Sequence, residues 1–288
     1  MRIGAIEVLA VDDGRFWLDG GSMFGVVPQA LWRKSNPPDE EGRIELALRC
    51  LLLRAEGRVL LVDTGIGDHW PAEEAARFRI DRAPGLLGAL AQQGLGPDDV
   101  TDVILTHLHF DHAGGAVQKG PSGLVPTFKK ARHHLQRRNF AHGQRPFARD
   151  KASYLARLIT PLIGGVEWTL YDGPAQILPG LDVLPFEGHT PGQQLIRVRD
   201  PQQRTGWLLY GADIVPTSSH LSPPFVMGYD LQPDVTAKEK ARLIHRAIED
   251  HGILVFEHDP KIDAASVTRD EKGRPVVERV ISLRAPTH

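Results

Sequence analysis

Six consecutive positions in the first half of the chain hold three imidazoles and one carboxylate. They are His107, His109, Asp111 and His112, and they follow directly on the apolar residues 103–105. Imidazole and carboxylate groups are the ligands that zinc and related divalent ions accept in proteins. The aliphatic run before them is typical of a buried strand. We therefore predict a metal site in a loop at the carboxyl end of a strand.

A lone histidine is often a surface or core residue, but this cluster is hard to explain in that way. Three of the thirteen histidines of the chain lie within six positions around an aspartate. Such a motif is a metal-site signal with a small risk of a chance match. Gly114 and Gly115 follow it, and they predict a tight turn in which the backbone comes close to another group.

Composition places the chain among ordinary globular proteins. Its 288 residues are 41% hydrophobic and 24% charged, with a formal net charge of −2. We expect a single domain over residues 1–288, with no nucleic-acid partner and no membrane partner. Cys50 is the one cysteine, which excludes an internal disulfide framework. Together with an N-terminus unlike a signal peptide, it favours a cytoplasmic location.

Hydrophobic periodicity predicts strands followed by an alternation of strands and helices. The first half is expected to contain strands at 3–11, 43–54 and 58–62, helices at 72–78 and 85–93, and an irregular segment at 16–39. Residues 129–163 look helical and locally basic. The second half is expected to contain strands at 168–171, 181–186, 194–199, 207–210, 253–256 and 277–283, and a helix at 236–250. The pattern predicts an α/β fold of two contacting sheets with helices outside, in four layers.

Three strands of the second half end in further potential ligands. His189, Asp213 and His258 each come a few residues after an apolar run. Together with the first cluster, they predict a site assembled from loops along one edge of the packed sheets. Gly188 and Gly211 precede two of these residues, and we expect them to let the backbone approach an ion.

Taken in order, these segments resemble the metallo-β-lactamase superfamily, and the resemblance covers most of the chain. The matching pieces are Asp63-Thr-Gly, the run from His107 to His112, Gly-His189-Thr-Pro-Gly, Asp213 and His258. The resemblance implies an αββα sandwich with a dinuclear metal site at one edge, between the two sheets. It also implies that His107, His109 and His189 hold one ion, that Asp111, His112 and His258 hold the second, and that Asp213 bridges them.

Two divalent ions are therefore expected, with zinc as the leading candidate and manganese, iron or cobalt as alternatives. Two close cations lower the pKa of a bridging water, which gives a hydroxide nucleophile near neutral pH. Asp111 is expected to be catalytic, ordering the nucleophile and returning a proton to the leaving alkoxide. Asp63 is not expected to bind metal itself; it either orients a ligating histidine or hydrogen-bonds a loop. No cysteine lies near a ligand segment, unlike the common zinc β-lactamases. This points to the lactonase, glyoxalase II and phosphodiesterase branches.

Longer segments resemble the quorum-quenching N-acyl-homoserine lactonase branch. They are residues 18–28 with the following Leu31-Trp32, residues 213–221 and residues 227–230. The resemblance implies hydrolysis of an acylated lactone, a small-molecule substrate whose acyl chain would enter past Met23, Phe24 and Trp32. These three side chains can equally be local core under a long loop, and for Trp32 the two interpretations carry equal weight.

One position departs from that branch. Known acyl-homoserine lactonases carry a tyrosine three residues after the bridging aspartate, and this chain has Pro216 there. Either His220 or Tyr229 takes over contact with the substrate, or the substrate differs. His220 can equally be a surface residue or a residue that supports the ligands.

Other functions use the same residues. A phosphotriesterase or phosphodiesterase would attack a phosphoryl centre with the same ions, although no compact arginine cluster lies beside the ligand segments. Thioester hydrolysis of the glyoxalase II type is a weaker alternative, and a non-catalytic binding module is weaker still. The oligomeric state is left open, with a homodimer among the options.

Overall fold

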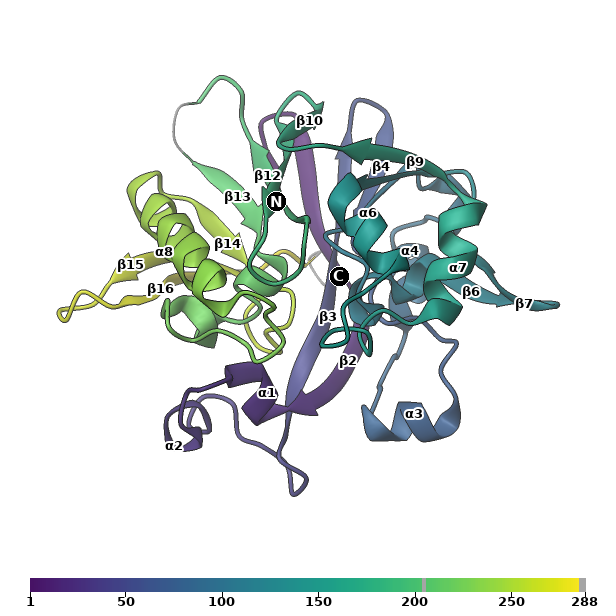
Figure 1. Ribbon diagram of the computed structural model, residues 1–288. Coiled ribbons are helices and arrows are strands. Elements are labelled where there is room, and N and C mark those ends of the chain that lie inside the picture. Colours follow the sequence, from purple (N-terminus) through teal and green to yellow (C-terminus); the bar gives the residue numbers. More distant parts are fainter. Residues whose placement is uncertain (204–205, 285–288) are drawn as a thin grey trace.

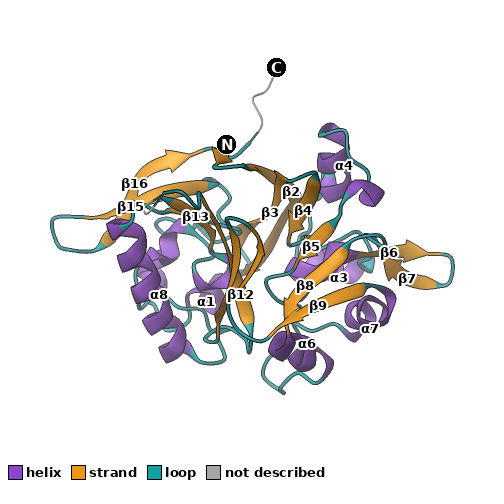
Figure 2. Ribbon diagram, turned by 90° about the horizontal axis from the view of Figure 1, so that it is seen from above, coloured by secondary structure: helices purple, strands orange, loops and turns teal. Residues whose placement is uncertain are grey.

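The computed structural model describes residues 1–203 and 206–284, so residues 204–205 and 285–288 of the expected domain lie outside the described residues. Two seven-stranded sheets lie face to face with helices on their outer sides (Figure 1, Figure 2). Within the described part of the chain, no helix is both long and apolar enough to cross a membrane. The expected four-layer α/β sandwich is confirmed.

The first sheet comes entirely from the first 171 residues. In spatial order its strands are β1 (Arg2–Ile3), β2 (Ile6–Asp19), β3 (Arg43–Ala55), β4 (Arg58–Val62), β5 (Asp102–Ile104), β8 (Arg132–Gln136) and β9 (Glu167–Tyr171). The pairs from β1 to β4 are antiparallel. The pairs from β4 to β9 are parallel, so β4 and β5 end at the same edge.

The second sheet comes from the rest of the chain. Its strands are β10 (Ala175–Leu178), β11 (Leu181–Phe186), β12 (Gln193–Arg199), β13 (Trp207–Tyr210), β14 (Ile253–Val255), β15 (Ala264–Arg269) and β16 (Pro275–Ile281), paired in that order. All neighbours are antiparallel except β13 and β14. A separate hairpin consists of β6 (Val117–Gly120) and β7 (Gly123–Pro126).

The helices of the described residues lie on the outer faces of the sheets and around the edge where the candidate ligands gather. They are α1 (Gly20–Phe24), α2 (Gln29–Trp32), α3 (Ala72–Arg77), α4 (Gly85–Gln92), α5 (Phe110–Ala113), α6 (Arg137–Gln144), α7 (Ala156–Gly165) and α8 (Pro233–Glu249). Short 3₁₀ turns span Pro97–Asp99, Gly114–Ala116, Ala212–Ile214 and Ser218–Leu221. Helices α4, α6 and α7 lie outside the first sheet, and α8 lies outside the second (Figure 2).

Strand β3 shows how the sequence produces these layers. Leu51 and Leu53 belong to the hydrophobic cluster shared by the two sheets. Cys50 and Leu52 belong to the cluster between the first sheet and its helices. Because side chains of a strand alternate between its faces, a continuous apolar run marks a strand that is buried on both sides. Cys50 is accordingly a small buried core residue.

Two expected elements are wrong in part. Residues 129–163 contain α6 and α7, but they also contain β8, whose residues His133 to Gln136 are buried between β5 and β9. Pairing with two neighbours has overridden a helical pattern there. The segment 16–39 is less irregular than expected, because β2 continues to Asp19 and is followed by α1 and α2.

Candidate metal centre

The predicted ligands all lie just beyond strand ends at one edge of the sandwich. His107 and His109 follow β5, and Asp111 and His112 form part of the short helix α5. His189 follows β11, Asp213 follows β13, and His258 follows β14. The first four come from the half of the chain that makes the first sheet, and the other three from the half that makes the second. The site therefore lies across the two sheets.

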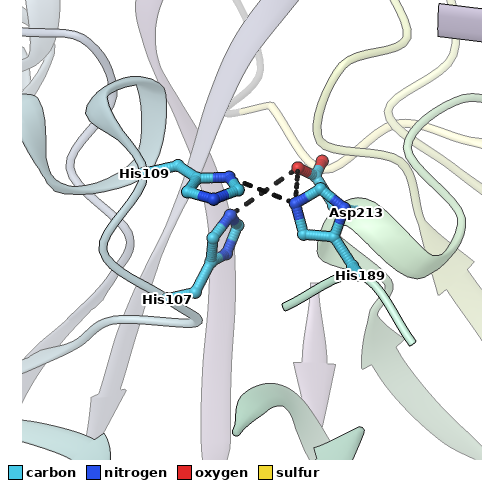
Figure 3. A group of neighbouring side chains, drawn as sticks. All are labelled: His107, His109, His189 and Asp213. Atoms are coloured by element: carbon cyan, nitrogen blue, oxygen red, sulfur yellow. Dashed lines mark hydrogen bonds and ion pairs between the residues drawn. The ribbon is translucent and has the colours of Figure 1, made fainter. Parts of the chain in front are cut away.

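Four of these residues form a first cluster, His107–His109–His189–Asp213, whose potential ligand atoms lie within 4.8 Å of one another. The three histidine rings and the aspartate turn toward a common centre (Figure 3). Nε2 of His189 lies 3.0 Å from Oδ2 of Asp213 and 3.1 Å from Nδ1 of His109. Nε2 of His107 lies 3.6 Å from the same aspartate oxygen.

The second cluster consists of Asp111, His112 and His258, again within 4.8 Å of one another. Nε2 of His258 lies 3.7 Å from Oδ2 of Asp111 and 3.2 Å from Oδ1 of Asp213. Nε2 of His112 lies 3.4 Å from Oδ2 of Asp213. The two oxygens of Asp213 thus face both clusters, which is the position that a bridging ligand would occupy.

Several atoms that point into the clusters lack any hydrogen-bond partner among the described residues. They are Nε2 of His107, Nε2 of His112 and Oδ1 of Asp213, and all three are buried. Buried polar atoms are nearly always hydrogen-bonded in native proteins, so this group calls for a ligand. A divalent cation fits, because each unpartnered atom can offer a lone pair.

Protonation states agree with that fit. Burial lowers the pKa of His107 and of His109 well below the usual value, so both rings are neutral and can donate a lone pair. At His189, burial acts in the same direction, but Asp213 and Asp230 outweigh it and raise the pKa to about 10. The carboxylates of the site therefore favour positive charge, which two divalent ions would supply.

Each of three histidines is fixed from behind by an acceptor at Nδ1. Asp230 accepts from His189 at 2.8 Å, Asp63 from His112 at 3.0 Å, and the carbonyl of Ala47 from His258 at 2.8 Å. Such contacts set the tautomer and leave Nε2 free for a metal. Asp63 lies behind His112, and it also accepts from the amide of Thr106 in the loop that follows β5. Its φ of +53° belongs to the left-handed region, which aspartate tolerates better than most residues.

The glycines near the candidate ligands lie where another part of the backbone comes close. A Cβ on Gly115 would lie 2.1 Å from the carbonyl oxygen of Thr64, which confirms the close backbone approach after the first motif. A Cβ on Gly188 would lie 2.4 Å from the amide nitrogen of Thr236 in α8. At Gly211 the nearest atom is the carbonyl oxygen of Val255, 3.2 Å away. Neighbouring backbone fills the space that a Cβ would take at both positions, so packing accounts for these two glycines, and their expected role in letting the backbone approach an ion stays a prediction.

Glu257 was not singled out from the sequence, and it is unusual because its carboxylate is buried beside the second cluster. Its side chain is fully buried, and neither carboxylate oxygen has a hydrogen-bond partner among the described residues. Oε1 lies 3.1 Å from Nδ1 of His112. Burial raises the pKa of Glu257 to about 7, against the opposing charge of His112. The sequence did contain a signal for Glu257, because it is a charged residue at the end of an apolar strand and precedes the predicted ligand His258.

A cavity of about 180 Å³ opens onto both clusters. Its wall combines ligands with mostly apolar side chains: Leu18, Met23, Phe78, His109, Phe110, Asp111, Ala152, Ser153, His189, Asp213, Met227, Tyr229 and His258. None of these lining residues is a lysine or an arginine. The amide of Gly228 donates to the carbonyl of Ser22 at 2.8 Å, so α1 and the segment carrying Tyr229 form one wall although they are far apart in sequence.

Only some of the expected substrate residues line this cavity. Met23 and Tyr229 do, whereas Phe24 and His220 are fully buried behind the wall. Phe24 is sandwiched between Trp32, at 5.3 Å between ring centroids, and His220, at 4.4 Å. Phe24, His220 and Trp32 are therefore core residues that shape the wall from behind. This corrects the expectation of direct substrate contact for Phe24 and His220, and for Trp32 it favours the alternative of local core.

His220 has both ring nitrogens engaged within the protein. Nε2 donates to the carbonyl of Met23 at 2.8 Å, and Nδ1 accepts from Oγ1 of Thr217 at 2.8 Å. Burial lowers the pKa of His220 to about 3, so the ring is neutral. Phe78, Phe110, Ala152 and Ser153 were missed as lining residues, because only the fold brings the segments 78 and 152–153 beside α5.

Comparison with known proteins agrees with this geometry. The model of the Metallo-beta-lactamase superfamily matches residues 46–258. An N-acyl homoserine lactonase of Bacillus thuringiensis is 26% identical over 226 residues, which cover 75% of this chain and 82% of that protein. The crystal structure of a probable metal-dependent hydrolase from Staphylococcus aureus has a TM-score of 0.85 at 27% identity, covering 98% of this chain and 100% of that chain.

A dizinc quorum-quenching lactonase, solved with a product, has a TM-score of 0.78 and covers 98% of this chain and 97% of its own. At 19% identity it shows likeness of the fold alone. The family model, by contrast, spans well over half of the sequence. The chain belongs to the metallo-beta-lactamase superfamily and is a metal-dependent hydrolase of that family.

Proposed function

We propose that this protein hydrolyses the ring ester of N-acyl-homoserine lactones with two divalent metal ions, zinc being the expected metal. The observation that carries the proposal is the cavity, which joins an apolar wall without lysine or arginine to a cluster of seven candidate ligands. A neutral substrate with an apolar chain and one compact ester suits such a wall. The similarity to N-acyl homoserine lactonases supports the same choice.

The ions, when bound, would supply Lewis acidity that activates water and polarises an ester carbonyl. His107, His109 and His189 are proposed to hold one ion, and Asp111, His112 and His258 the other, with Asp213 shared. Three of these rings are fixed through Nδ1: His189 by Asp230, His112 by Asp63 and His258 by the carbonyl of Ala47. The orientation of these three rings is therefore set before substrate enters.

Asp111 is proposed to move the proton. Its carboxylate lines the cavity and lies next to His258 of the second cluster. From there it can take a proton from the attacking water and return it to the alkoxide oxygen that leaves the ring. An ester alkoxide needs a single proton to leave as an alcohol, whereas an amide nitrogen is a much poorer leaving group. We therefore expect the acyl amide to remain intact.

Tyr229 is proposed to take over the substrate contact that Pro216 cannot make. Its side chain lines the cavity together with Asp111, Asp213 and His258. Burial raises the pKa of the Tyr229 phenol, so the hydroxyl stays protonated and can donate to a carbonyl oxygen. Tyr229→Phe should lower kcat/KM for lactones by about 10-fold, the cost of one hydrogen bond, and leave metal content unchanged.

Product analysis tests the proposal. Metal-loaded protein is incubated with an N-acyl-homoserine lactone, proton release is followed in a pH-stat, and the product is identified by mass spectrometry. The expected product is the acyl-homoserine acid, heavier than the substrate by one water. Free homoserine lactone with a fatty acid would indicate an acylase. Inertness toward every lactone, together with rapid cleavage of a phosphotriester, would replace the proposal with phosphotriester hydrolysis.

A further inference from the structure

The buried carboxylate of Glu257 has no role in the function proposed so far. Among the described residues, the one basic group within 4.0 Å of it is Nδ1 of His112, at 3.1 Å. Neither of its oxygens has a hydrogen-bond partner there. Burying an ionised carboxylate without hydrogen bonds is costly, so an arrangement of this kind requires a compensating positive charge.

Nδ1 of His112 already has a well-placed acceptor in Asp63. Oδ2 of Asp63 lies 3.0 Å from it, and Thr106 holds Asp63 through its amide and its hydroxyl, both at 2.7 Å. His112 is thus backed by two carboxylates. The other rings are backed more weakly, because His189 faces the single carboxylate of Asp230 and His258 faces a neutral carbonyl.

A carboxylate behind an imidazole makes the opposite nitrogen a better metal donor. For His112 that nitrogen is Nε2, which faces Asp213 and the second cluster. A cation held by Asp111, His112 and His258 would lie on the far side of the ring from Glu257. The cation would balance the negative charge of Glu257. In return, the charge of Glu257 would stabilise the metal-bound form relative to the metal-free form.

We propose that Glu257 is a positioning residue for the second metal ion: acting through His112, it tightens the binding of a divalent cation at Asp111–His112–His258 and leaves the first cluster unaffected. This inference rests on the ligand assignment proposed above. It does not depend on the substrate. Glu257 is not one of the seven candidate ligands, and it does not line the cavity.

Stepwise metal titration tests it without any activity assay. Apo-protein is titrated with Co²⁺ alone, following visible absorption, and the two dissociation constants are refined by competition with a chelator. In Glu257→Gln, which preserves shape and removes the charge, the second constant should weaken by about 10- to 100-fold while the first stays at the parent value. Asp230→Asn is the matched control, because it should weaken the first ion instead.

Thermal melting gives a readout that distinguishes charge balance from simple packing. Without metal, Glu257→Gln should melt at the parent temperature or above it, because it removes one of two buried carboxylates that share a single imidazole. With saturating Co²⁺, its gain in melting temperature should be smaller than that of the parent protein. Glu257→Asp keeps the charge at a shorter reach, and its second constant should fall between those of the parent and the Gln variant.

Two results would overturn the inference. One is a Glu257→Gln protein that binds both ions as tightly as the parent. The other is equal weakening of both ions together with a lower melting temperature of the apo form, which would indicate a packing role alone. Should the Gln variant not fold, an unchanged second constant in Glu257→Asp decides against the inference in the same way. A parent protein that binds one ion would instead refute the ligand assignment itself, and the inference with it.

Discussion

Asp111 combines two properties that a metal-dependent hydrolase needs in one side chain. It belongs to the second ligand cluster, and it forms part of the cavity wall. Asp111→Asn preserves size but gives a poorer ligand that cannot accept a proton. We expect kcat for lactone hydrolysis to fall by about 10²- to 10⁴-fold, with KM changed little.

Metal content must be measured on the same sample of Asp111→Asn, because loss of an ion would mimic loss of proton transfer. Full occupancy by metal analysis together with a rate within a few-fold of the parent would show that Asp111 carries no proton. Full occupancy with a large loss in kcat supports the proposed role.

The buried imidazole of His220 makes the stability of the protein depend on pH. Burial lowers its pKa in the folded protein to about 3, from an ordinary value of 6.5. Between these values the unfolded chain binds a proton that the folded protein does not. The free energy of unfolding should therefore fall as pH is lowered through this window, by up to about 1.4 kcal/mol per pH unit from this residue.

Denaturant unfolding of the apo-protein at several pH values between 4 and 7 measures that slope. His220→Ala should be less stable at pH 7, by about 2–4 kcal/mol, because it leaves a cavity beside Phe24 and frees the carbonyl of Met23. Its stability should also decline less steeply toward low pH. An unchanged slope in the variant would mean that His220 is not the group responsible.

At the scale of elements, α8 braces the loop that carries His189. Thr236 of α8 packs directly against Gly188, and the carboxylate of Glu239 accepts from the amides of Glu187 and Gly188 at about 3 Å. Gly188→Ala would drive a methyl group into the backbone of α8. We expect a loss of about 1–3 kcal/mol in stability and weaker binding of the first ion, because His189 is displaced.

The same substitution at Gly164 in α7 is a matched control. Nothing lies within 4 Å of a Cβ built there, and the residue is helical. Gly164→Ala should leave metal binding unchanged and add up to about 1 kcal/mol of stability. Chemical unfolding and metal titration of both variants distinguish a specific brace from a general effect of adding a methyl group.

An element could be predicted from the sequence when a short stretch of residues was enough to define it. The bounds predicted for strand β4, 58–62, agree with the structure because its apolar run is short and bounded by Gly57 and Asp63. Strand β8 was lost inside an expected helix, because its assignment depends on pairing with β5 and β9, which lie far away in sequence. The hairpin β6–β7 and strands β10 and β15 were missed as well, although each of them pairs with a strand that lies close by in the sequence.

The candidate site divides in the same way. The candidate ligands could be named from the sequence because each follows an apolar run and the motif has a fixed spacing. The cavity wall could not be predicted from the sequence. Phe24 and His220 lie in the same segments that were expected to contact substrate as Met23 and Tyr229, but they face the core. Which side of a short helix faces a cavity is decided by packing, here by the stack of Trp32, Phe24 and His220.

At the scale of the whole molecule, the proposed ions would join the two sheets. Each cluster combines residues from both halves of the chain, so removing the ions should loosen the contact between the halves. We expect a chelator to lower the melting temperature by several degrees, because a ligand at 100 times its dissociation constant adds about 2.7 kcal/mol. Differential scanning calorimetry with and without chelator measures this.

A variant that lacks ligands from both clusters, His107→Ala with His258→Ala, provides the control for chelation. Its melting temperature should be the same with and without chelator. A shift of the parent's size in this variant would mean that the chelator acts on some other part of the protein.

The order of strands in the two sheets has a consequence for how this protein comes into being. The chain passes from the first sheet to the second once, between β9 and β10, and does not return among the described residues. A ribosome therefore completes one half, with four of the seven candidate ligands, before it has made any of the other three. Neither half of the chain contains all the residues of either cluster. Catalysis would thus begin only after both halves have docked, so activity itself reports that assembly is complete.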